Sequence, residues 1–307
     1  MLVSHRPTDH TAGRSIVSIV GLAIGDQTFP LLSHEEMLDI GVLLGFEAVD
    51  LILAGGRSHL ALDKVRADVP AWAGRIEERL LQRRLVAADV FVLPWTDFQT
   101  LAPNHPDADE RLKSRELFCD TLEFAVRVGA PGMTILPGVE WGNASHDDSL
   151  ARAAEELSWR AAQARGRGLR FSVEAHIGSV IEHPDEALRL IEMADGVELT
   201  LDYGHFVAKG FQEAEIERLI PHSRHFHARC ARPERLQSSM NENVIDFERV
   251  IDLMQESDYE GYLGLEYVWV DWEHCNECDN VSETVLLKRR LEAKLAGRSW
   301  TYTESPI

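Results

Sequence analysis

Residues 169–268 decide the fold of this chain, because four short motifs there each place a polar residue at the end of an apolar run. The motifs are FSVEAH (171–176), LTLDYGH (199–205), RHFHAR (224–229) and LGLEYV (263–268). The runs are short, contain β-branched and aromatic residues, and alternate with helical patterns, which is typical of parallel βα units. We therefore interpret each run as a buried strand with a functional side chain at its C-terminal end.

The same alternation extends over the whole chain and predicts eight strands. They are expected at residues 15–23, 48–53, 88–93, 133–136, 169–174, 197–202, 223–228 and 261–267. Helical patterns are expected at residues 34–45, 70–85, 109–128, 148–167, 184–194, 246–256 and 281–296. Ser33 with Glu36 resembles a capping box, and Pro70 and Pro184 suit first helical turns. Strands that alternate with helices in this number predict an α/β protein, a single-domain (β/α)8 barrel.

The alternative fold is a doubly wound open sheet. Such a sheet usually has a glycine-rich phosphate turn after its first strand. The corresponding stretch here, GLAIGD (21–26), lacks the third glycine and a clear following helix. No Pro-, Ser- or Gly-rich linker divides the chain, so we expect one barrel over residues 15–307, preceded by a flexible polar segment at 1–14.

The composition limits the partners of the protein. The formal charge is −20 at pH 7, which repels phosphate backbones and anionic lipid, so we expect neither nucleic acid nor a membrane as a partner. Without a signal sequence or an apolar run of membrane-spanning length, we expect a cytoplasmic protein. Cys275 and Cys278 form a single CNEC pair, and because no second pair follows we interpret them as structural or free thiols.

Glu174, Asp202, His227 and Glu266 are candidate metal ligands. They stand at the ends of predicted strands five to eight, and in a barrel these ends meet at one rim. A single acidic residue at a strand end usually caps a helix or pairs with an arginine, but four polar residues on successive strands favour a shared ion. Three carboxylates and one imidazole suit Mn²⁺, Mg²⁺, Co²⁺ or Zn²⁺.

Other polar residues surround this predicted centre. His205 follows Asp202 on the same rim and is expected to contact substrate or support a ligand. Strand alternation places His225 one layer below His227, where it is expected to be a hydrogen-bonded core histidine. Arg229, immediately beyond that strand, is a candidate for binding a substrate oxygen or pairing with a glutamate.

This arrangement suggests an enzyme that transfers protons on a small neutral carbonyl compound. A divalent ion that chelates a carbonyl and its neighbouring hydroxyl acidifies the adjacent C–H and stabilises the enediolate. Glu174 and Glu266 come from different strands and could flank the substrate. One could remove a proton and the other return it, which would give isomerisation or epimerisation.

The stretches VEAHIGS (173–179), LTLDYGH (199–205), FHAR (226–229) and residues 244–268 resemble the motifs of the xylose-isomerase-like barrels, a superfamily of sugar phosphate isomerases and epimerases that includes inosose dehydratases. The resemblance implies a (β/α)8 fold and one ion, with Mn²⁺ the first expectation, held by the four candidate ligands. It also implies the two glutamates as acid and base, His205 near the substrate, and a sugar or sugar conjugate as that substrate. The chain departs from the epimerases in strand two, where Asp50 is the only acid, and after His227, where Ala228, Arg229 and Cys230 replace the usual lysine or acid.

A second resemblance, to the larger subunit of the C-glycoside deglycosidases, implies a lyase on a 3-keto sugar. In that reading His146, in the loop GVEWGNASHDD (138–148), removes the proton, although a histidine near a helix start can equally be a surface residue. Trp141, Trp269 and Trp272 are candidates for stacking on a sugar or aglycone, and equally for packing. We expect a homo-oligomer, or a hetero-oligomer with a small subunit if this relationship holds.

Overall fold

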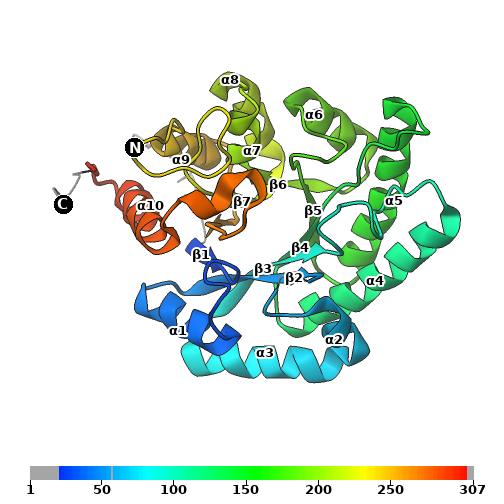
Figure 1. Cartoon of the computed structure of the whole chain (residues 1–307), viewed down its shortest axis with the longest axis horizontal. Helices are drawn as coiled ribbons and strands as arrows, with labels where there is room; N and C mark the ends of the chain where they lie inside the picture. The colour runs from blue at the N-terminus through cyan, green and yellow to red at the C-terminus, as the bar shows by residue number, and fades with distance from the viewer. Residues whose placement is uncertain (1–20, 57, 303–307) are drawn as a thin grey trace, which may run out of the picture.

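The computed structural model describes residues 21–56 and 58–302 and shows one closed barrel of parallel strands (Figure 1). Each strand pairs with the next, and β8 pairs with β1 to close the ring. The single-domain (β/α)8 barrel predicted from the sequence is confirmed. The strands are β1 Gly21–Gly25, β2 Ala48–Ala54, β3 Val86–Leu93, β4 Gly132–Ile135, β5 Arg170–Glu174, β6 Glu198–Asp202, β7 Ser223–Ala228 and β8 Tyr262–Leu265.

Helices surround the strands on the outside of the barrel (Figure 1). They are α1 His34–Leu43, α2 Leu62–Ala67, α3 Val69–Arg83, α4 Ala108–Arg127, α5 His146–Gly166, α6 Pro184–Met193, α7 Tyr203–Ala208, α8 Glu213–Ile216, α9 Phe247–Glu256 and α10 Asn280–Leu295, with 3-10 turns η1 Glu217–His222 and η2 Trp272–Glu277. None of the helices in the described ranges has the length and apolar character needed to span a bilayer. The expected segment 1–14 and the first part of predicted strand 15–23 lie outside the described residues.

Local signals in the sequence explain where several elements begin and end. Ser33 and Glu36 form the predicted capping box at the start of α1. Pro184 occupies the first turn of α6, where its missing N–H costs nothing. Gly129 and Gly168 have φ angles of 72° and 78° at the turns into β4 and β5, a region that residues with a Cβ seldom adopt.

The interior of the barrel is unusually polar. Many barrels of this kind fill their interior with branched apolar side chains. Here Thr134, Ser172 and Thr200 join their hydroxyls at 2.7–3.2 Å. Below them, Arg224 Nη2 donates to Asp89 Oδ1 at 2.6 Å and to Thr134 Oγ1 at 3.0 Å. These side chains form a continuous buried hydrogen-bonded network in the lower half of the barrel.

Two register shifts accompany this network. Between β6 and β7, Leu199 pairs with Ser223 and Thr200 with His225, so Arg224 is an extra residue in its strand. Between β2 and β3, the pairing skips Ala88, which directly precedes Asp89. Such bulges redirect side chains locally. Both members of the buried ion pair therefore lie at or next to a bulge.

We predict that Asp89→Ala destabilises the fold by about 3–5 kcal/mol, because it leaves the Arg224 guanidinium buried without its charge partner. Urea unfolding at neutral pH measures the loss. Asp195→Ala, which removes a carboxylate that is 87% exposed, serves as the control and should change stability by less than about 1 kcal/mol.

The same pair makes a pH-dependent contribution. Burial by itself would raise the pKa of Asp89, but the Arg224 guanidinium holds that pKa below its ordinary value. The stability that this pair contributes is therefore complete above the pKa of the carboxyl in the unfolded chain, about 4. It is lost as the pH falls through the lower pKa of Asp89 in the folded protein. If the difference in the free energy of unfolding between the wild type and Asp89→Ala grew on acidification, this assignment would be contradicted.

Candidate metal centre and substrate pocket

The four predicted ligands lie together at the C-terminal mouth of the barrel, and all are buried. Glu174 and Asp202 are the last residues of β5 and β6, and His227 is the next-to-last residue of β7. Glu266 directly follows β8, and its N–H continues the ladder by donating to Ala228 O at 3.1 Å. The alternation of side chains along each strand therefore directs these four residues into the barrel.

His227 and Arg229 connect the three carboxylates. His227 Nδ1 lies 2.7 Å from Glu174 Oε1 and 3.3 Å from Glu266 Oε2. Arg229 Nη2 donates to Asp202 Oδ2 at 2.5 Å and also to Glu266 Oε2. The imidazole and the guanidinium thus supply the positive charge that three carboxylates at one buried place require.

The charges of the basic side chains follow from these contacts. Burial by itself would lower the pKa of His227, but Glu266 and Glu174 raise it to about 10, so the ring is a cation in this arrangement. Burial also opposes the charge of Arg229, and Asp202 and Glu266 outweigh it and raise the pKa of its guanidinium. The two cations hold the carboxylates in place.

The donor set fits a divalent metal ion. Ligand atoms of Glu174, His227 and Glu266 all lie within 4.8 Å of one another, close enough to share one ion. Asp202 joins them through Arg229. Carboxylate oxygens with one imidazole nitrogen suit Mn²⁺, Mg²⁺, Co²⁺ or Zn²⁺. An ion at this place would take over the charge balance that Arg229 and protonated His227 now provide.

Two further histidines lie beside the ligands. His205 is buried, with Nε2 at 3.5 Å from Asp202 Oδ2, and its ring lies 4.2 Å from that of His176. The structure therefore brings His205 to the ligands, as predicted, but behind His176. His176 itself stacks on Trp272 at 5.0 Å, and burial lowers its pKa to about 4, which keeps the ring neutral.

His176 is the site residue that the sequence reasoning missed. It stands two positions after Glu174 in the EAH motif, and this spacing past a strand end was the available signal. Its neutral ring can accept a proton or a hydrogen bond from a substrate hydroxyl.

A pocket of about 410 Å³ lies directly above these residues. Its floor is polar and carries Glu174, Glu266 and Arg229, with His176 at the side. Its walls are mainly apolar and aromatic: Ala54, Phe91, Leu93, Phe98, Val268, Val270 and Trp272, together with Gln27, Thr96 and Asp271. A mostly apolar cavity with a few convergent polar groups is typical of a small-molecule site.

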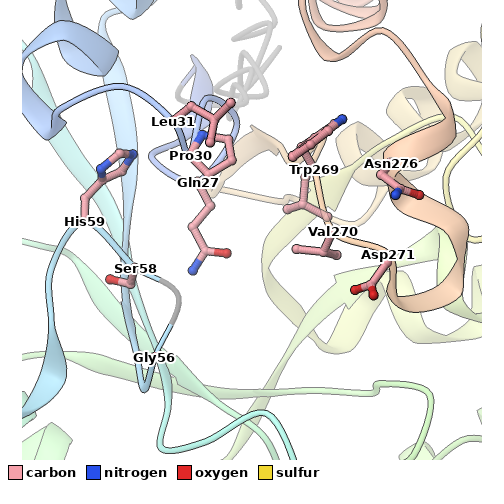
Figure 2. Close-up of a pocket in the computed structure, with 11 residues that line it drawn as sticks. Gln27, Pro30, Leu31, Gly56, Ser58, His59, Trp269, Val270, Asp271 and Asn276 are labelled. Carbon is pink, nitrogen blue, oxygen red and sulfur yellow. The ribbon is translucent and has the colours of Figure 1, made fainter.

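Arg229 is the predicted substrate-binding residue that reaches the pocket floor. Of the three candidate tryptophans, Trp272 lines this pocket, and Trp141 and Trp269 do not. Trp141 donates from Nε1 to Asn104 Oδ1 at 3.0 Å and packs against His105. Trp269 is 49% exposed and lines a neighbouring cavity (Figure 2). Trp272 is the tryptophan of the β8 loop that lines the pocket.

His146 also lies apart from the ligands in this structure. It is the first residue of α5, and its Nε2 lies 2.8 Å from Glu186 Oε2 while its Nδ1 pairs with Glu140. These two glutamates raise the pKa of His146, which favours the imidazolium form. His146 is absent from the residues that line the pocket, and its role in proton transfer stays a prediction.

Comparison with known proteins identifies the family. The profile of the xylose isomerase-like TIM barrel family matches residues 39–287. This chain belongs to the xylose isomerase-like TIM barrel family. The predicted resemblance is thereby confirmed, and the match extends from α1 into α10, so it includes the strands that carry all four candidate ligands.

Individual relatives within this family are distant. An inosose dehydratase of Clostridium botulinum is 24% identical over 259 residues, covering 76% of this chain and 86% of the relative. The structure of D-psicose 3-epimerase from Clostridium cellulolyticum H10 with D-tagatose has a TM-score of 0.68 at 14% identity, covering 90% of this chain and 97% of that one. A xylose isomerase-like TIM barrel protein from Mycobacterium smegmatis in complex with magnesium has a TM-score of 0.62 at 16% identity, covering 85% of this chain and 89% of that one. At 14% and 16% identity, the similarity to these two solved structures shows that this chain shares their fold.

We predict that replacing Glu174, Asp202, His227 or Glu266 by Ala weakens Mn²⁺ binding at least about tenfold, since each change removes a candidate ligand and outer partners alone typically contribute 10–100-fold. Isothermal titration of the metal-free variants measures the affinity, and circular dichroism checks their folding. Asp185→Ala on the surface of α6 is the matched control and should bind Mn²⁺ like the wild type. Unchanged affinity in Asp202→Ala would exclude it from the ligand set.

Proposed function

We propose that this protein is a divalent-metal-dependent enzyme that removes a proton next to the carbonyl of a sugar or keto sugar and returns it, as in isomerisation or epimerisation. The observation that carries the proposal is the pair Glu174 and Glu266 on the pocket floor, whose carboxylates lie 2.7 and 3.3 Å from the same atom, His227 Nδ1. Sugar-modifying relatives, named as dehydratases and as a 3-epimerase, support the same general chemistry.

The reaction follows from the chemistry of these groups. A divalent ion held by the four ligands, with Mn²⁺ the first choice and Mg²⁺, Co²⁺ or Zn²⁺ as alternatives, would act as a Lewis acid toward the substrate oxygens. One glutamate takes the proton from the carbon, and the electron pair of the C–H bond moves into the carbonyl to give an enediolate. The other glutamate can return a proton from the opposite side, which inverts that carbon.

The remaining pocket residues position and shield the substrate. Arg229 can donate to a substrate oxygen once it no longer bridges Asp202 and Glu266. Phe91 and Phe98 with Trp272 form apolar walls that exclude water from the reacting carbon. Among the described residues that line the pocket, Arg229 is the one Lys or Arg side chain, and it is already paired with Asp202 and Glu266, so an unphosphorylated sugar fits this site better than a sugar phosphate.

A lyase is the second candidate function, and His176 is the observation that favours it. After the same proton removal, loss of a hydroxyl or another group from the neighbouring carbon completes an elimination. His176 lines the pocket as a neutral imidazole and could receive the proton or assist the leaving group. The inosose dehydratase relatives are lyases by name, which supports this alternative.

Solvent exchange distinguishes the two reactions. We predict that Mn²⁺-loaded protein, incubated in D₂O with ketoses and with keto sugars, introduces deuterium at the carbon next to the carbonyl. NMR identifies the carbon and the product. An epimer labelled at that carbon supports the first proposal, a dehydrated or cleaved product supports the lyase, and a panel without exchange or product would contradict both. Removal of the metal by a chelator should abolish exchange, and added Mn²⁺ should restore it.

A pair of histidine variants tests which side chain moves the proton. If His146 is the base, His146→Ala lowers kcat steeply while Mn²⁺ binding stays normal. If His176 carries the proton, as in the lyase alternative, His176→Ala should lower kcat by about 10²- to 10⁴-fold. Steady-state kinetics with the substrate found in D₂O measures both. Equal and full activity of both variants would leave the two glutamates as the acid and base.

A further inference from the structure

Asp50, the acid of strand β2, lies inside the barrel next to the candidate metal centre. Its Oδ2 lies 3.1 Å from His225 Nε2, and both side chains are buried. Asp50, His225 and His227 each offer an atom that lies within 4.8 Å of the other two. This group of one carboxylate and two imidazoles is therefore joined to the metal centre through His227, which belongs to both.

A glycine of β8 makes room for this carboxylate. Gly264 pairs with His227 of β7, and a Cβ at Gly264 would overlap Asp50 Oδ2 and come within 3.2 Å of His225 Nε2. The backbone of Gly264 does not have a positive φ, so its conformation does not require glycine. A glycine inside a strand often marks a place where another group approaches closely. At position 264 that group is the Asp50 carboxylate.

The hydrogen-bonding capacity of Asp50 is only partly used. Its Oδ1 is buried and has no hydrogen-bond partner among the described residues. Asp89, which lies opposite Asp50 in the register of β2 and β3, accepts from Arg224 and from Thr134. A buried carboxylate oxygen without a donor is costly. Asp50 therefore keeps one acceptor atom for a donor in its surroundings.

His227 can supply this donor. Its Nδ1 lies beside Glu174 and Glu266, so Nδ1 is the nitrogen that would bind an ion there. A neutral imidazole that gives Nδ1 to a metal keeps its proton on Nε2. Histidine ligands usually donate this second N–H to a carboxylate or carbonyl, which fixes the ring and raises its basicity. Of the described carboxylates grouped with His227, Asp50 is the one outside the candidate ligand set.

We propose that Asp50 is a positioning residue for the metal centre. Its carboxylate accepts from the second nitrogen of His227, directly or through one water, and fixes the imidazole in the orientation that gives Nδ1 to the ion. His225 holds the Asp50 carboxylate in turn, through its Nε2. The inference rests on the metal centre of the proposed function, and it concerns the affinity for the ion and not the proton transfer.

Mn²⁺ binding tests this role without turnover. We expect Asp50→Asn, which keeps the shape of the side chain and removes its charge, to weaken Mn²⁺ binding about tenfold in isothermal titration. Because Asp50 acts through His227, the same change in the His227→Ala background should alter the affinity by less than about twofold. Asp89→Asn is the matched control, since it neutralises a buried acid that pairs with Arg224, and its affinity should stay within about twofold of the wild type.

Pulsed EPR of the bound Mn²⁺ adds a readout that a purely structural role of Asp50 would leave unchanged. The nitrogen coupling of the imidazole should be present in the wild type and in Asp89→Asn, lost in His227→Ala and altered in Asp50→Asn. Circular dichroism checks that each variant is folded. Asp50→Ala, which leaves no polar group at this position, is the second variant and should lose at least as much affinity as Asp50→Asn.

The outcomes separate this proposal from the proposed function. Unchanged affinity in the Asp50 variants, or the same loss with and without His227, would overturn the positioning role. Two Mn²⁺ ions per wild-type chain that fall to one in Asp50→Asn would make Asp50 a ligand of a second ion and also overturn it. A wild type that binds no Mn²⁺ would contradict the metal centre and this role together. Coupling between Asp50 and His227 without exchange in D₂O contradicts the proposed reaction alone.

Discussion

The pairing of β7 with the buried carboxylates is the interaction on which the rest of the barrel interior depends. Basic residues of β7 and of the segment just after it contact acidic residues from other strands. Arg224 pairs with Asp89, His225 with Asp50, His227 with Glu174 and Glu266, and Arg229 with Asp202 and Glu266. A carboxylate removed from water is costly unless it is paired and hydrogen-bonded. One strand therefore compensates acids contributed by five others.

These buried pairs determine the register of β7 more than they add to the stability of the fold. Buried ion pairs contribute little net stability compared with apolar packing, but separating one partner from the other is expensive. A shift of β7 by one residue would turn each basic side chain away from its acid. The lower pairs thus fix the register of β7, and that register places His227 and Arg229 at the mouth, where an ion and a substrate can reach them.

Hydrogen bonds between loops hold the walls of the two cavities in place. Gln237 and Asn280 connect the segments after β7, β8 and β1 by hydrogen bonds. The walls of both cavities are therefore attached to the barrel. Functional groups supported in this way keep the geometry that proton transfer requires.

The sequence by itself determined the barrel, its eight strands and the residues at the strand ends, because the alternation of apolar and polar residues reports directly which side chains face inward. It therefore located Glu174, Asp202, His227 and Glu266 at the mouth. The sequence did not show the bulges beside Asp89 and at Arg224, because the alternation of side chains along one strand does not tell which residues of the neighbouring strand it pairs with. Only the tertiary structure decided the loops: His146 pairs with Glu186 from the next helix, and Gln237 holds Val268, contacts between residues 40 and 31 positions apart. Such contacts have no local pattern, so the walls around the predicted centre could be assigned only once the chain was folded.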